Sequence, residues 1–552
     1  MKHKFFGKFA SAAVALCIIA APVLSVSAAE IKEDEFDSVT KQAADYNPSS
    51  LPSTYSAQKA VPVAAGSLPI SYSSKTLGLV TAIKEQKYND CWAYSGTETL
   101  ETKLLKIGQS VNEFSADHAN AWATAQSNGK GWQRQYNGGG FQSIYPGYLT
   151  SWSGGAETSA VGTIDFSKSF YSDSIATDKT KYGTTKLRYF TDYNIDEIKQ
   201  AIMDNGAVST SYATTNYCFN AQRTAYYMPQ SYDGSYVGHA ICIVGWNDSI
   251  SKTRFTNSTG EQPKSNGAWL VRNSWGDYNN LGGYFWISYE DKYIFGQKYA
   301  PSYTIDEVVK ITDDMQLVQN EKFGATYEFD YLDDNVITFI NCFNFDKNHR
   351  TLDKVMFETT AKGARYQVYY IPIKNEAPTG KESEWTLIAN GTVTDAGYMY
   401  ADTNGFVVPE GKGAIGIKLS TNASTECTLG VGEWLTSDSK MVFLNDSKSG
   451  DSYIYAGNKM NELLNWYKTS RNDSTGGTFV IKALAATNPN LMPGDVNLDK
   501  KLTIADVTFI MKHITNLSPL SGTKLANADY NGDGEITITD ATLVQRKVVG
   551  LI

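Results

Sequence analysis

The sequence predicts a multidomain protein: an α+β domain comes first, an all-β sandwich follows, and a small all-α domain ends the chain. Its 552 residues are too many for one hydrophobic core, because single domains usually hold about 100–200 residues. Helix and strand patterns mix over residues 68–300, short alternating strands recur over 301–486, and an internal repeat occupies 493–552. Three successive folding units are therefore expected.

The composition excludes several classes of protein. The chain is 42% hydrophobic and 19% charged, which is typical of folded domains and not of disordered chains. Its net charge of −9 argues against a nucleic-acid partner, because a polyanion requires clustered Lys and Arg. No stretch after the N-terminal region approaches about 18 consecutive apolar residues, so no membrane span is expected.

Residues 1–29 have the features of a secretory signal peptide. Three lysines near the N-terminus precede an apolar run over residues 9–24, and small residues ending at Ala29 provide a cleavage site. A membrane-anchoring helix is the alternative, but the run is short and no stop-transfer charges follow it. We therefore expect an exported protein, and we interpret residues 30–67 as a leader or prosegment.

The first two domains are predicted from their periodicity. Residues 97–107 and 196–204 have helical periodicity, and strands are expected over 239–246, 269–272 and 284–289. Helical periodicity is nearly absent from the sandwich region. Its expected strands cover residues 354–358, 366–371, 385–389, 414–419, 453–455 and 479–484.

Five cysteines follow the signal peptide, and this number is odd. They are Cys91, Cys218, Cys242, Cys342 and Cys427. None forms a C-x-x-C pair, so a cysteine-rich zinc site is not expected. At least one thiol must be unpaired or bond another chain, and the disulfide pairing among the last four stays open.

Cys91 is the candidate nucleophile. It stands just before a helical pattern, where the positive end of the helix dipole favours a thiolate. Gln86, five residues upstream, has a side-chain amide that can donate a hydrogen bond to a developing oxyanion.

A candidate base and an orienting group occur much later in the chain. His239 opens an apolar strand, which is a rigid platform for a catalytic group. Asn273 follows another predicted strand and can present its amide oxygen to an imidazole. Trp275 can shield that hydrogen bond from water.

Three short segments together resemble the papain family of cysteine peptidases over about residues 68–300. They are Cys91-Trp92-Ala93, Gly238-His239-Ala240 and Asn273-Ser274-Trp275-Gly276. The resemblance implies that Cys91 is the nucleophile, His239 the general base and acid, and Asn273 the orienting residue. It also implies that Gln86 contributes to the oxyanion hole.

Three features depart from the pattern of that family. Gln86 lies one residue closer to the nucleophile than usual. Asp90 directly precedes the nucleophile, and its negative charge is expected to oppose thiolate formation. A polar stretch over residues 248–266 resembles a surface insertion and about doubles the usual interval between His239 and Asn273.

A run of three glycines resembles the edge of the substrate cleft in the same family. Gly138, Gly139 and Gly140 would let the backbone of an extended peptide form hydrogen bonds there. Trp275 is expected to line the same cleft. An ordinary flexible turn is the alternative interpretation of the glycines.

Residues 301–486 resemble the lectin-like β domain that follows some bacterial and archaeal peptidases of this type. The resemblance is diffuse and lies mainly in the segments that begin at Gly413 and Gly477. Two roles stay open: a structural buttress, or a module that recruits glycan or cell wall. Residues 487–492 are expected to form a linker.

The C-terminal repeat predicts two calcium-binding loops. Each copy carries oxygen-bearing side chains at loop positions 1, 3, 5, 9 and 12, and an apolar helix pattern follows. Two acidic surface turns are the alternative. Position 6 is Lys500 in the first loop and Gly534 in the second, so the first turn is expected to be more strained. The predicted ligands are Asp495, Asn497, Asp499, Lys501 (by its carbonyl), Thr503 and Asp506, and then Asp529, Asn531, Asp533, Glu535, Thr537 and Asp540.

A loop followed by a helix, repeated without a preceding helix, resembles a type I dockerin over residues 493–552. The resemblance implies two bound Ca²⁺ ions and, as partner, a cohesin module on the scaffold of a bacterial cellulose-degrading assembly, the cellulosome. Cohesin choice would depend on Ile504-Ala505 and Ile538-Thr539, and these two pairs differ.

Together these features predict a secreted, extracellular cysteine endopeptidase that acts on protein or peptide substrates and needs no cofactor for catalysis. Its dockerin would attach it to a cellulosome-like scaffold. Two alternatives fit the same chain: a catalytically inactive protein with the peptidase fold, or a carbohydrate-binding protein docked on the same scaffold.

Overall fold

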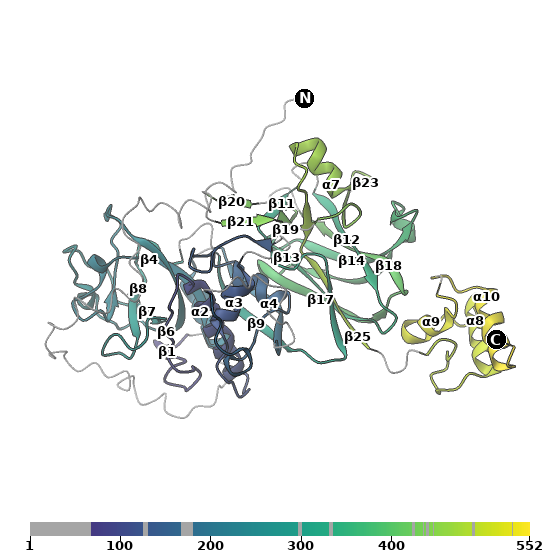
Figure 1. Cartoon of the computed structure of the whole chain (residues 1–552), viewed down its shortest axis with the longest axis horizontal. Helices are drawn as coiled ribbons and strands as arrows, with labels where there is room; N and C mark the ends of the chain where they lie inside the picture. The colour runs from purple at the N-terminus through teal and green to yellow at the C-terminus, as the bar shows by residue number, and fades with distance from the viewer. Residues whose placement is uncertain are drawn as a thin grey trace. The chain divides into compact units, whose positions relative to one another are not determined.

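The computed structural model in Figure 1 describes residues 68–551 except 125–130, 167–179, 192, 296–300, 331–334, 422–425, 434, 438–440, 445–446, 488–491 and 533. Two compact units form. The first unit comprises the chain up to residue 310 together with 322–327 and 434–444, and the second unit comprises the remaining residues. The predicted signal peptide and leader lie outside the described residues. Within the described part of the chain, no helix has the length and apolar character needed to cross a membrane.

The first unit is organised around an antiparallel sheet with one parallel pair, β5 and β8. β1 (Ser71–Ser73) adds to β6 at one side. The strands lie in the order β3 (Tyr182–Phe190), β9 (Ser302–Lys310), β4 (Val208–Thr214), β6 (Val237–Asn247), β7 (Ala268–Arg272), β8 (Tyr284–Ser288) and β5 (Ala225–Tyr226).

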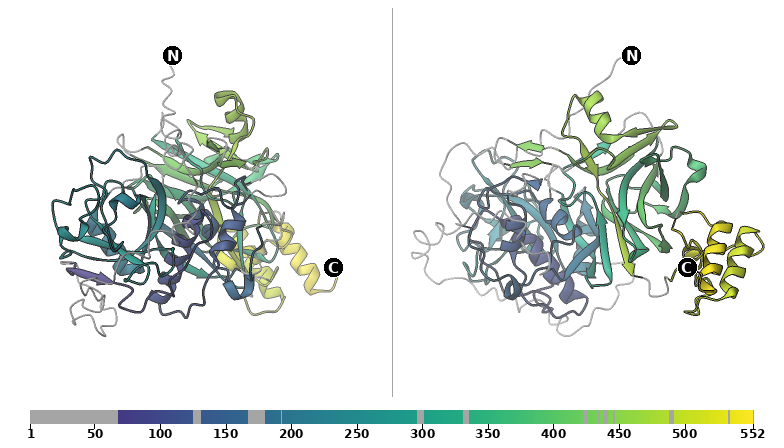
Figure 2. Two further views of the ribbon diagram at one scale, coloured as in Figure 1. Left: turned by 60° about the vertical axis from the view of Figure 1, so that its left-hand side comes forward. Right: turned by 45° about the vertical axis from the view of Figure 1, so that its right-hand side comes forward.

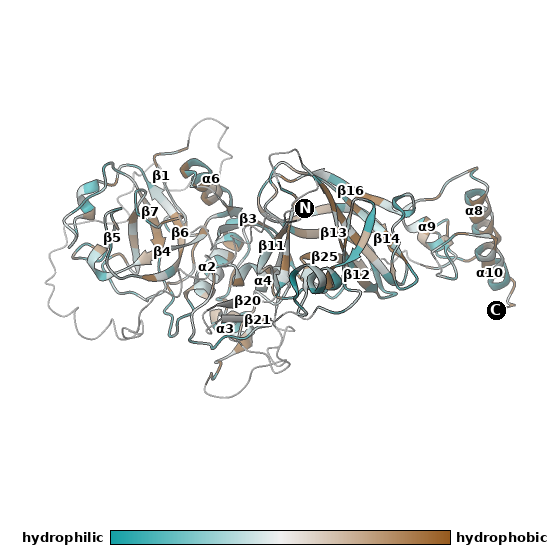
Figure 3. Cartoon of the chain, turned by 90° about the horizontal axis from the view of Figure 1, so that it is seen from above, coloured by the Kyte–Doolittle hydropathy of each residue, from teal (hydrophilic) through white to brown (hydrophobic). Residues whose placement is uncertain are grey.

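Strands β6 and β7 confirm two of the predicted strands and bring distant residues together. Both are coloured mainly as hydrophobic in Figure 3, and their side chains are almost all buried. Cys242 of β6 lies opposite Arg272 of β7 in the antiparallel register. The residues just before Cys242 therefore face the residues just after Arg272. The insertion over 248–266 connects the opposite ends of these strands, so it does not disturb this pairing.

Helices pack on this sheet. α2 (Cys91–Lys106) begins six residues before the predicted helix, whereas α6 (Ile195–Asn205) agrees with its prediction to within one residue. The side chain of Asn194 caps α6 by accepting hydrogen bonds from two backbone N–H groups, and Gly206 ends the helix with a φ of 92°. The sequence did not predict the shorter helices α3 (Ala116–Trp122) and α4 (Ile144–Thr150).

The second unit contains the predicted all-β domain. Trp385, Tyr453 and Tyr455 pack in its core with Ile340 and Ile371, so these aromatic side chains serve packing. One sheet has the order β15-β14-β18-β12-β22-β23, with β16 on β14, and another contains β10-β25-β13-β17. Their bounds are β10 (Met315–Gln319), β12 (Val336–Phe345), β13 (His349–Thr359), β14 (Arg365–Lys374), β15 (Ala377–Pro378), β16 (Thr386–Thr392), β17 (Gly397–Val407), β18 (Gly411–Ser420), β22 (Ser452–Ala456), β23 (Lys459–Glu462) and β25 (Ile481–Thr487).

The C-terminal segment folds into three helices: α8 (Ile504–Ile514), α9 (Gly522–Ala528) and α10 (Ile538–Val548). Figures 1 and 2 show α8 and α10 side by side. Ile510 and Val544 are fully buried between them in a small apolar core. A capping box starts both helices, because a Thr and the Asp three residues later each satisfy a backbone N–H of the first turn. The multidomain fold class expected from the sequence is thereby confirmed.

Candidate active site

Cys91 lies at the first position of α2 with its thiol toward strand β6. Its side chain is partly exposed, and its Sγ accepts a hydrogen bond from the backbone N–H of Ala240 at 3.4 Å. Because Ala240 directly follows His239, the thiol lies beside the candidate base, although the two residues are far apart in sequence.

His239 is buried and is held by two neighbours. Its Nε2 lies 2.8 Å from Oδ1 of Asn273, and its ring stacks on Trp275 with the centroids 4.7 Å apart. An amide oxygen can only accept, so Nε2 carries the proton and Nδ1 is the basic nitrogen. Burial lowers the pKa of His239 to about 4, against the opposing effect of the hydrogen bond to Asn273.

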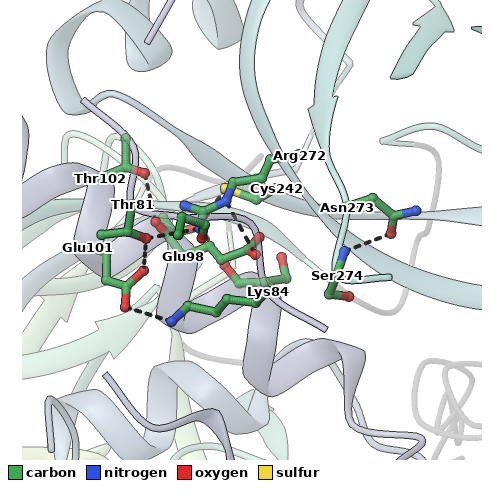
Figure 4. A network of polar contacts seen from close by, with 12 residues as sticks. Thr81, Lys84, Glu98, Glu101, Thr102, Cys242, Arg272, Asn273 and Ser274 are labelled. Carbon is green, nitrogen blue, oxygen red and sulfur yellow. Dashed lines mark hydrogen bonds and ion pairs between the residues drawn. The ribbon is translucent and has the colours of Figure 1, made fainter. Parts of the chain in front are cut away.

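Asn273 is fully buried, and its amide is fixed at both ends. Oδ1 also accepts from the backbone N–H of Ser274 at 2.9 Å, as Figure 4 shows, and Nδ2 donates to the hydroxyl of Tyr278 at 3.2 Å. The amide oxygen is thereby kept toward the imidazole.

Gln86 also reaches this site despite its shortened spacing to Cys91. Its backbone N–H donates to the carbonyl of Ser274 at 2.7 Å, and its Oε1 accepts from the Ser274 hydroxyl at 2.6 Å. Its Nε2 donates to the carbonyl of Tyr88 at 2.7 Å. The structure therefore brings Gln86, Cys91, His239 and Asn273 together.

Asp90 differs from the sequence-based expectation. Its carboxyl is fully buried, and its Oδ2 accepts from Nδ2 of Asn120 at 2.9 Å. Burial, reinforced by the nearby carboxylate of Asp117, raises the pKa of Asp90 to about 8. The group is therefore mostly uncharged at pH 7, and the prediction that its negative charge opposes a thiolate is wrong at that pH.

The predicted glycine edge lies close to the nucleophile's helix. Gly139 adopts a φ of 81°, which L-residues rarely adopt. A Cβ on Gly140 would lie 2.1 Å from Nε1 of Trp92, so no larger residue fits there. A hydrogen bond also joins the segment before Cys91 to the segment before the glycines, because the backbone N–H of Asn89 donates to Oδ1 of Asn137 at 2.8 Å.

A buried ionic network joins α2 to β7 and to the segment before Gln86 (Figure 4). Nε of Arg272 lies 3.3 Å from Oε1 of Glu98, and Nζ of Lys84 lies 3.1 Å from Oε1 of Glu101. Arg272 also donates to the hydroxyl of Thr81 at 2.9 Å. Because Asn273 directly follows Arg272, the network fixes the strand end that carries the orienting residue.

The two C-terminal loops have matching geometry. Asp506 and Asp540, at position 12, each accept three backbone N–H groups of their own loop. They are fully buried and form no ion pair with any described Lys or Arg, and the same holds for Asp495. Buried carboxylates without a counter-charge suit a bound cation.

The assignment of individual calcium ligands stays a prediction. No group of three or more His, Cys, Asp or Glu side chains in the described part of the chain has an arrangement that could hold a metal ion. Asp533, one of the predicted ligands, lies outside the described residues. At position 6, Lys500 adopts a φ of 64° and Gly534 a φ of 85°.

Comparison with known proteins decides the family. The model of the papain family of cysteine proteases matches residues 68–305, the lectin-like domain matches 317–485, and the type I dockerin domain matches 493–549. The structure is similar to the clostridial cysteine protease Cwp84 after propeptide cleavage, with a TM-score of 0.68 and 32% identity, over 76% of this chain and 99% of that one. The chain belongs to the papain family of cysteine peptidases.

Further relatives agree with this assignment. The cysteine protease and lectin-like domains of Cwp84, a surface layer associated protein of Clostridium difficile, match with a TM-score of 0.67 and 32% identity, over 76% of this chain and 90% of that one. Cathepsin Q of Rattus norvegicus is 25% identical over 40% of this chain. The matched part spans 59% of the length of that cathepsin.

Several residues of this papain-family site were not found by sequence reasoning. Tyr278, Asn120 and Arg134 lie in no recognisable motif. Folding brings Asn120 beside Asp90, which is 30 residues away in sequence, whereas Tyr278 and Arg134 each lie five residues from their partners, Asn273 and Gly139. The five cysteines considered above form no disulfide bond with one another in the structure.

Proposed function

We propose that this chain is a secreted cysteine endopeptidase with Cys91, His239 and Asn273 as its catalytic groups. One observation carries the proposal. The imidazole donates from Nε2 to Asn273, while the residue after His239 donates its backbone N–H to the thiol of Cys91. A thiol, a base and an orienting amide from three separate elements thus lie near one another, which supports thiol-based acyl transfer.

In the proposed reaction, Nδ1 of His239 alternately accepts and donates a proton. Nδ1 takes the thiol proton, and the Cys91 thiolate attacks the peptide carbonyl carbon. Nδ1–H then protonates the leaving amine nitrogen as the C–N bond breaks, which leaves a thioester on Cys91. Water attacks the thioester while Nδ1 accepts its proton, and that proton returns to the thiol as the acid leaves.

Stabilisation of the oxyanion is assigned to Gln86 and the backbone N–H of Cys91. An amide NH₂ group has two hydrogens, and the carbonyl of Tyr88 takes one of those on Gln86. The other hydrogen is the proposed donor to the substrate oxygen. The hydroxyl of Ser274 fixes the amide by donating to its oxygen, so the donor is preorganised.

The proposed substrate is an extended segment of protein. The backbone at Gly138–Gly140 carries no side chains that would block such a segment, and Gly138 is exposed. The ring of Trp275, stacked on His239, would form another wall and exclude water from the catalytic hydrogen bond.

The C-terminal domain is proposed to hold the enzyme on an extracellular scaffold. Type I dockerin domains generally bind calcium, and the buried carboxylates of Asp495, Asp506 and Asp540 suit that ion. A cohesin module of a cellulosome-like scaffold is the proposed partner. Calcium would stabilise the loops and would take no part in peptide hydrolysis.

The catalytic assignment is tested by comparing the wild type with Cys91→Ala. Casein or a peptide library should be cleaved by the wild type and not by Cys91→Ala. A thiol-directed epoxide should label Cys91 at neutral pH. The control is Cys342→Ala, because burial raises the pKa of the partly exposed Cys342 to about 12 and keeps it a thiol. Equal cleavage by wild type and Cys91→Ala would refute the assignment, and slow labelling without cleavage would favour an inactive peptidase fold.

A further inference from the structure

Arg134 is a buried cation close to the active site. It is 1% exposed, and its guanidinium forms no ion pair among the described residues. Nε donates to the carbonyl of Gly139 at 2.7 Å, and Nη2 donates to the carbonyl of Tyr136 at 3.2 Å. Burying a guanidinium among neutral groups costs free energy. The hydrogen bonds of Arg134 must therefore stabilise the surrounding fold enough to offset that cost.

A second set of contacts connects Arg134 to the start of α2. Nη1 donates to Oδ1 of Asn120 at 2.7 Å, and Nδ2 of Asn120 donates to Oδ2 of Asp90 at 2.9 Å. The amide of Asn120 is thus oriented at both ends. Asp90 is the residue at the N-cap of α2, yet its side chain does not cap the helix. Its hydrogen-bonding capacity is directed to Asn120 instead.

The ring of Trp92 completes the connection. The guanidinium carbon of Arg134 lies 5.4 Å from the centroid of this ring, within the range of a cation–π contact. The edge of the same ring approaches Gly140 so closely that a Cβ there would lie 2.1 Å from Nε1. Arg134 therefore contacts both sides of the boundary between the glycine edge and the nucleophile's helix.

We propose that Arg134 is a positioning residue of the peptidase site, which fixes the Gly138–Gly140 edge relative to the N-terminal end of the helix that carries Cys91. The inference rests on the proposed function, because that edge is where the substrate backbone is proposed to bind. A planar guanidinium can donate hydrogen bonds to the carbonyl of Gly139 and to the side chain of Asn120 at the same time, whereas a lysine ammonium group cannot donate in both of these directions.

The test compares Arg134→Gln and Arg134→Lys with the wild type and with a matched control. The control is Arg350→Gln, which removes another buried guanidinium whose Nε donates to a backbone carbonyl, that of Val408 at 2.7 Å. Active sites are first titrated with a thiol-directed epoxide. KM and kcat per titrated site are then measured with an extended peptide, and hydrogen exchange is followed over residues 135–140.

Arg134→Gln should raise KM about ten-fold, the effect of losing one charge-assisted hydrogen bond, while kcat per titrated site changes less. Exchange over 135–140 should accelerate, Arg134→Lys should recover part of both effects, and Arg350→Gln should show neither. A merely structural role would lower the number of titratable sites and leave KM and local exchange unchanged, which would overturn the proposal.

If Arg134→Gln does not fold, Arg134→Lys decides by the same readouts. If the wild type cleaves no peptide, the proposed function fails, and the exchange comparison still decides the role of Arg134.

Discussion

The carboxyl group of Asp90 lies directly before the nucleophile, but its environment makes it a poor anion. Its Oδ1 has no hydrogen-bond partner among the described residues, and burial raises its pKa to about 8. Arg134 acts in the opposite direction and favours the charged form, but desolvation is the larger effect. A neutral carboxyl at pH 7 removes a like charge from the neighbourhood of the thiolate.

This protonation predicts how Asp90→Asn changes the pH dependence of stability. The native-state pKa is raised above the unfolded value, so the native state binds the proton more tightly. Wild-type stability from this group is fully present below about pH 4 and is lost as the pH rises to about 8. The Asn variant has no such loss, so its free energy of unfolding should gain on the wild type by up to about 1.4 kcal/mol per pH unit in this window.

Denaturant unfolding of both proteins between pH 4 and 9 measures this difference. Asp233→Asn, which removes an exposed carboxyl, controls for the change in net charge. A difference between Asp90→Asn and wild type that stays constant across the window would contradict the protonation assigned to Asp90.

The residues of the site differ in how well they could be predicted from the sequence. Cys91, His239 and Asn273 could be proposed because each stands in a short motif at the start of a helix or at a strand end. Arg134 and Asn120 carry no such local signal. They lie within a loop and a short unpredicted helix. Asn120 meets Asp90 from 30 residues away in sequence, and Arg134 contacts Gly139, five residues later, through the local course of its loop.

Among the secondary-structure elements, α2 shows why one boundary was misplaced. The predicted helix began at residue 97 because apolar periodicity begins there, yet the helix starts at Cys91. The first two turns face the sheet with buried polar groups. Ser95 donates to the carbonyl of Ile241 at 2.7 Å and lies 2.7 Å from the hydroxyl of Ser209. Polar groups that are satisfied by tertiary contacts give no signal in a hydrophobicity pattern.

The predicted strand over 479–484 shows a second kind of error. The structure divides it into β24 (Gly477–Phe479) and β25 (Ile481–Thr487). β24 pairs with β19 (Thr428–Glu433), whereas β25 pairs with β13 and β10. The chain thus changes sheets at Val480, and a continuous apolar run is equally suitable for both pairings. The alternation of apolar residues predicts that a strand forms here, but it does not predict which strands it pairs with.

The contact between α2 and β7 supports a prediction about their ionic pair. Glu98 and Arg272 are both fully buried, and burial raises the pKa of Glu98 to about 7 although Arg272 opposes the shift. Removing one partner leaves an uncompensated buried group, so Glu98→Gln or Arg272→Met should each lower the free energy of unfolding by ~3–5 kcal/mol. The double variant should lose less than the sum.

Equilibrium unfolding of the wild type, both single variants and the double variant measures the coupling between the two side chains. The exposed pair Lys412 and Glu376 is a matched control, since exposed pairs contribute ~0–1 kcal/mol. Additive losses for Glu98 and Arg272 would show that the pair does not join α2 to β7.

At the scale of the whole molecule, the two C-terminal loops differ in backbone strain while their hydrogen bonds match. Leu498 and Lys500 adopt φ values of 65° and 64° in the first loop, where the second loop has Gly532 and Gly534. A left-handed conformation costs a non-glycine residue roughly 1–2 kcal/mol. The first loop should therefore bind Ca²⁺ more weakly, because its closed form carries this cost.

Lys500→Gly tests whether that strain limits the proposed attachment of the enzyme. Relief of the strained φ should tighten calcium binding to the first loop, by less than the full backbone cost because glycine also gains entropy in the unfolded chain. Calorimetric calcium titration of the full chain measures the change, with Lys500→Ala, which removes the charge but keeps a non-glycine residue at the left-handed φ, as the control. Chelation by EGTA should lower the melting temperature of the C-terminal helices, while peptide cleavage by the same preparation stays constant, since no predicted calcium ligand lies among the catalytic residues. Loss of cleavage on chelation, or identical affinities for Lys500→Gly and wild type, would contradict this separation of attachment from catalysis.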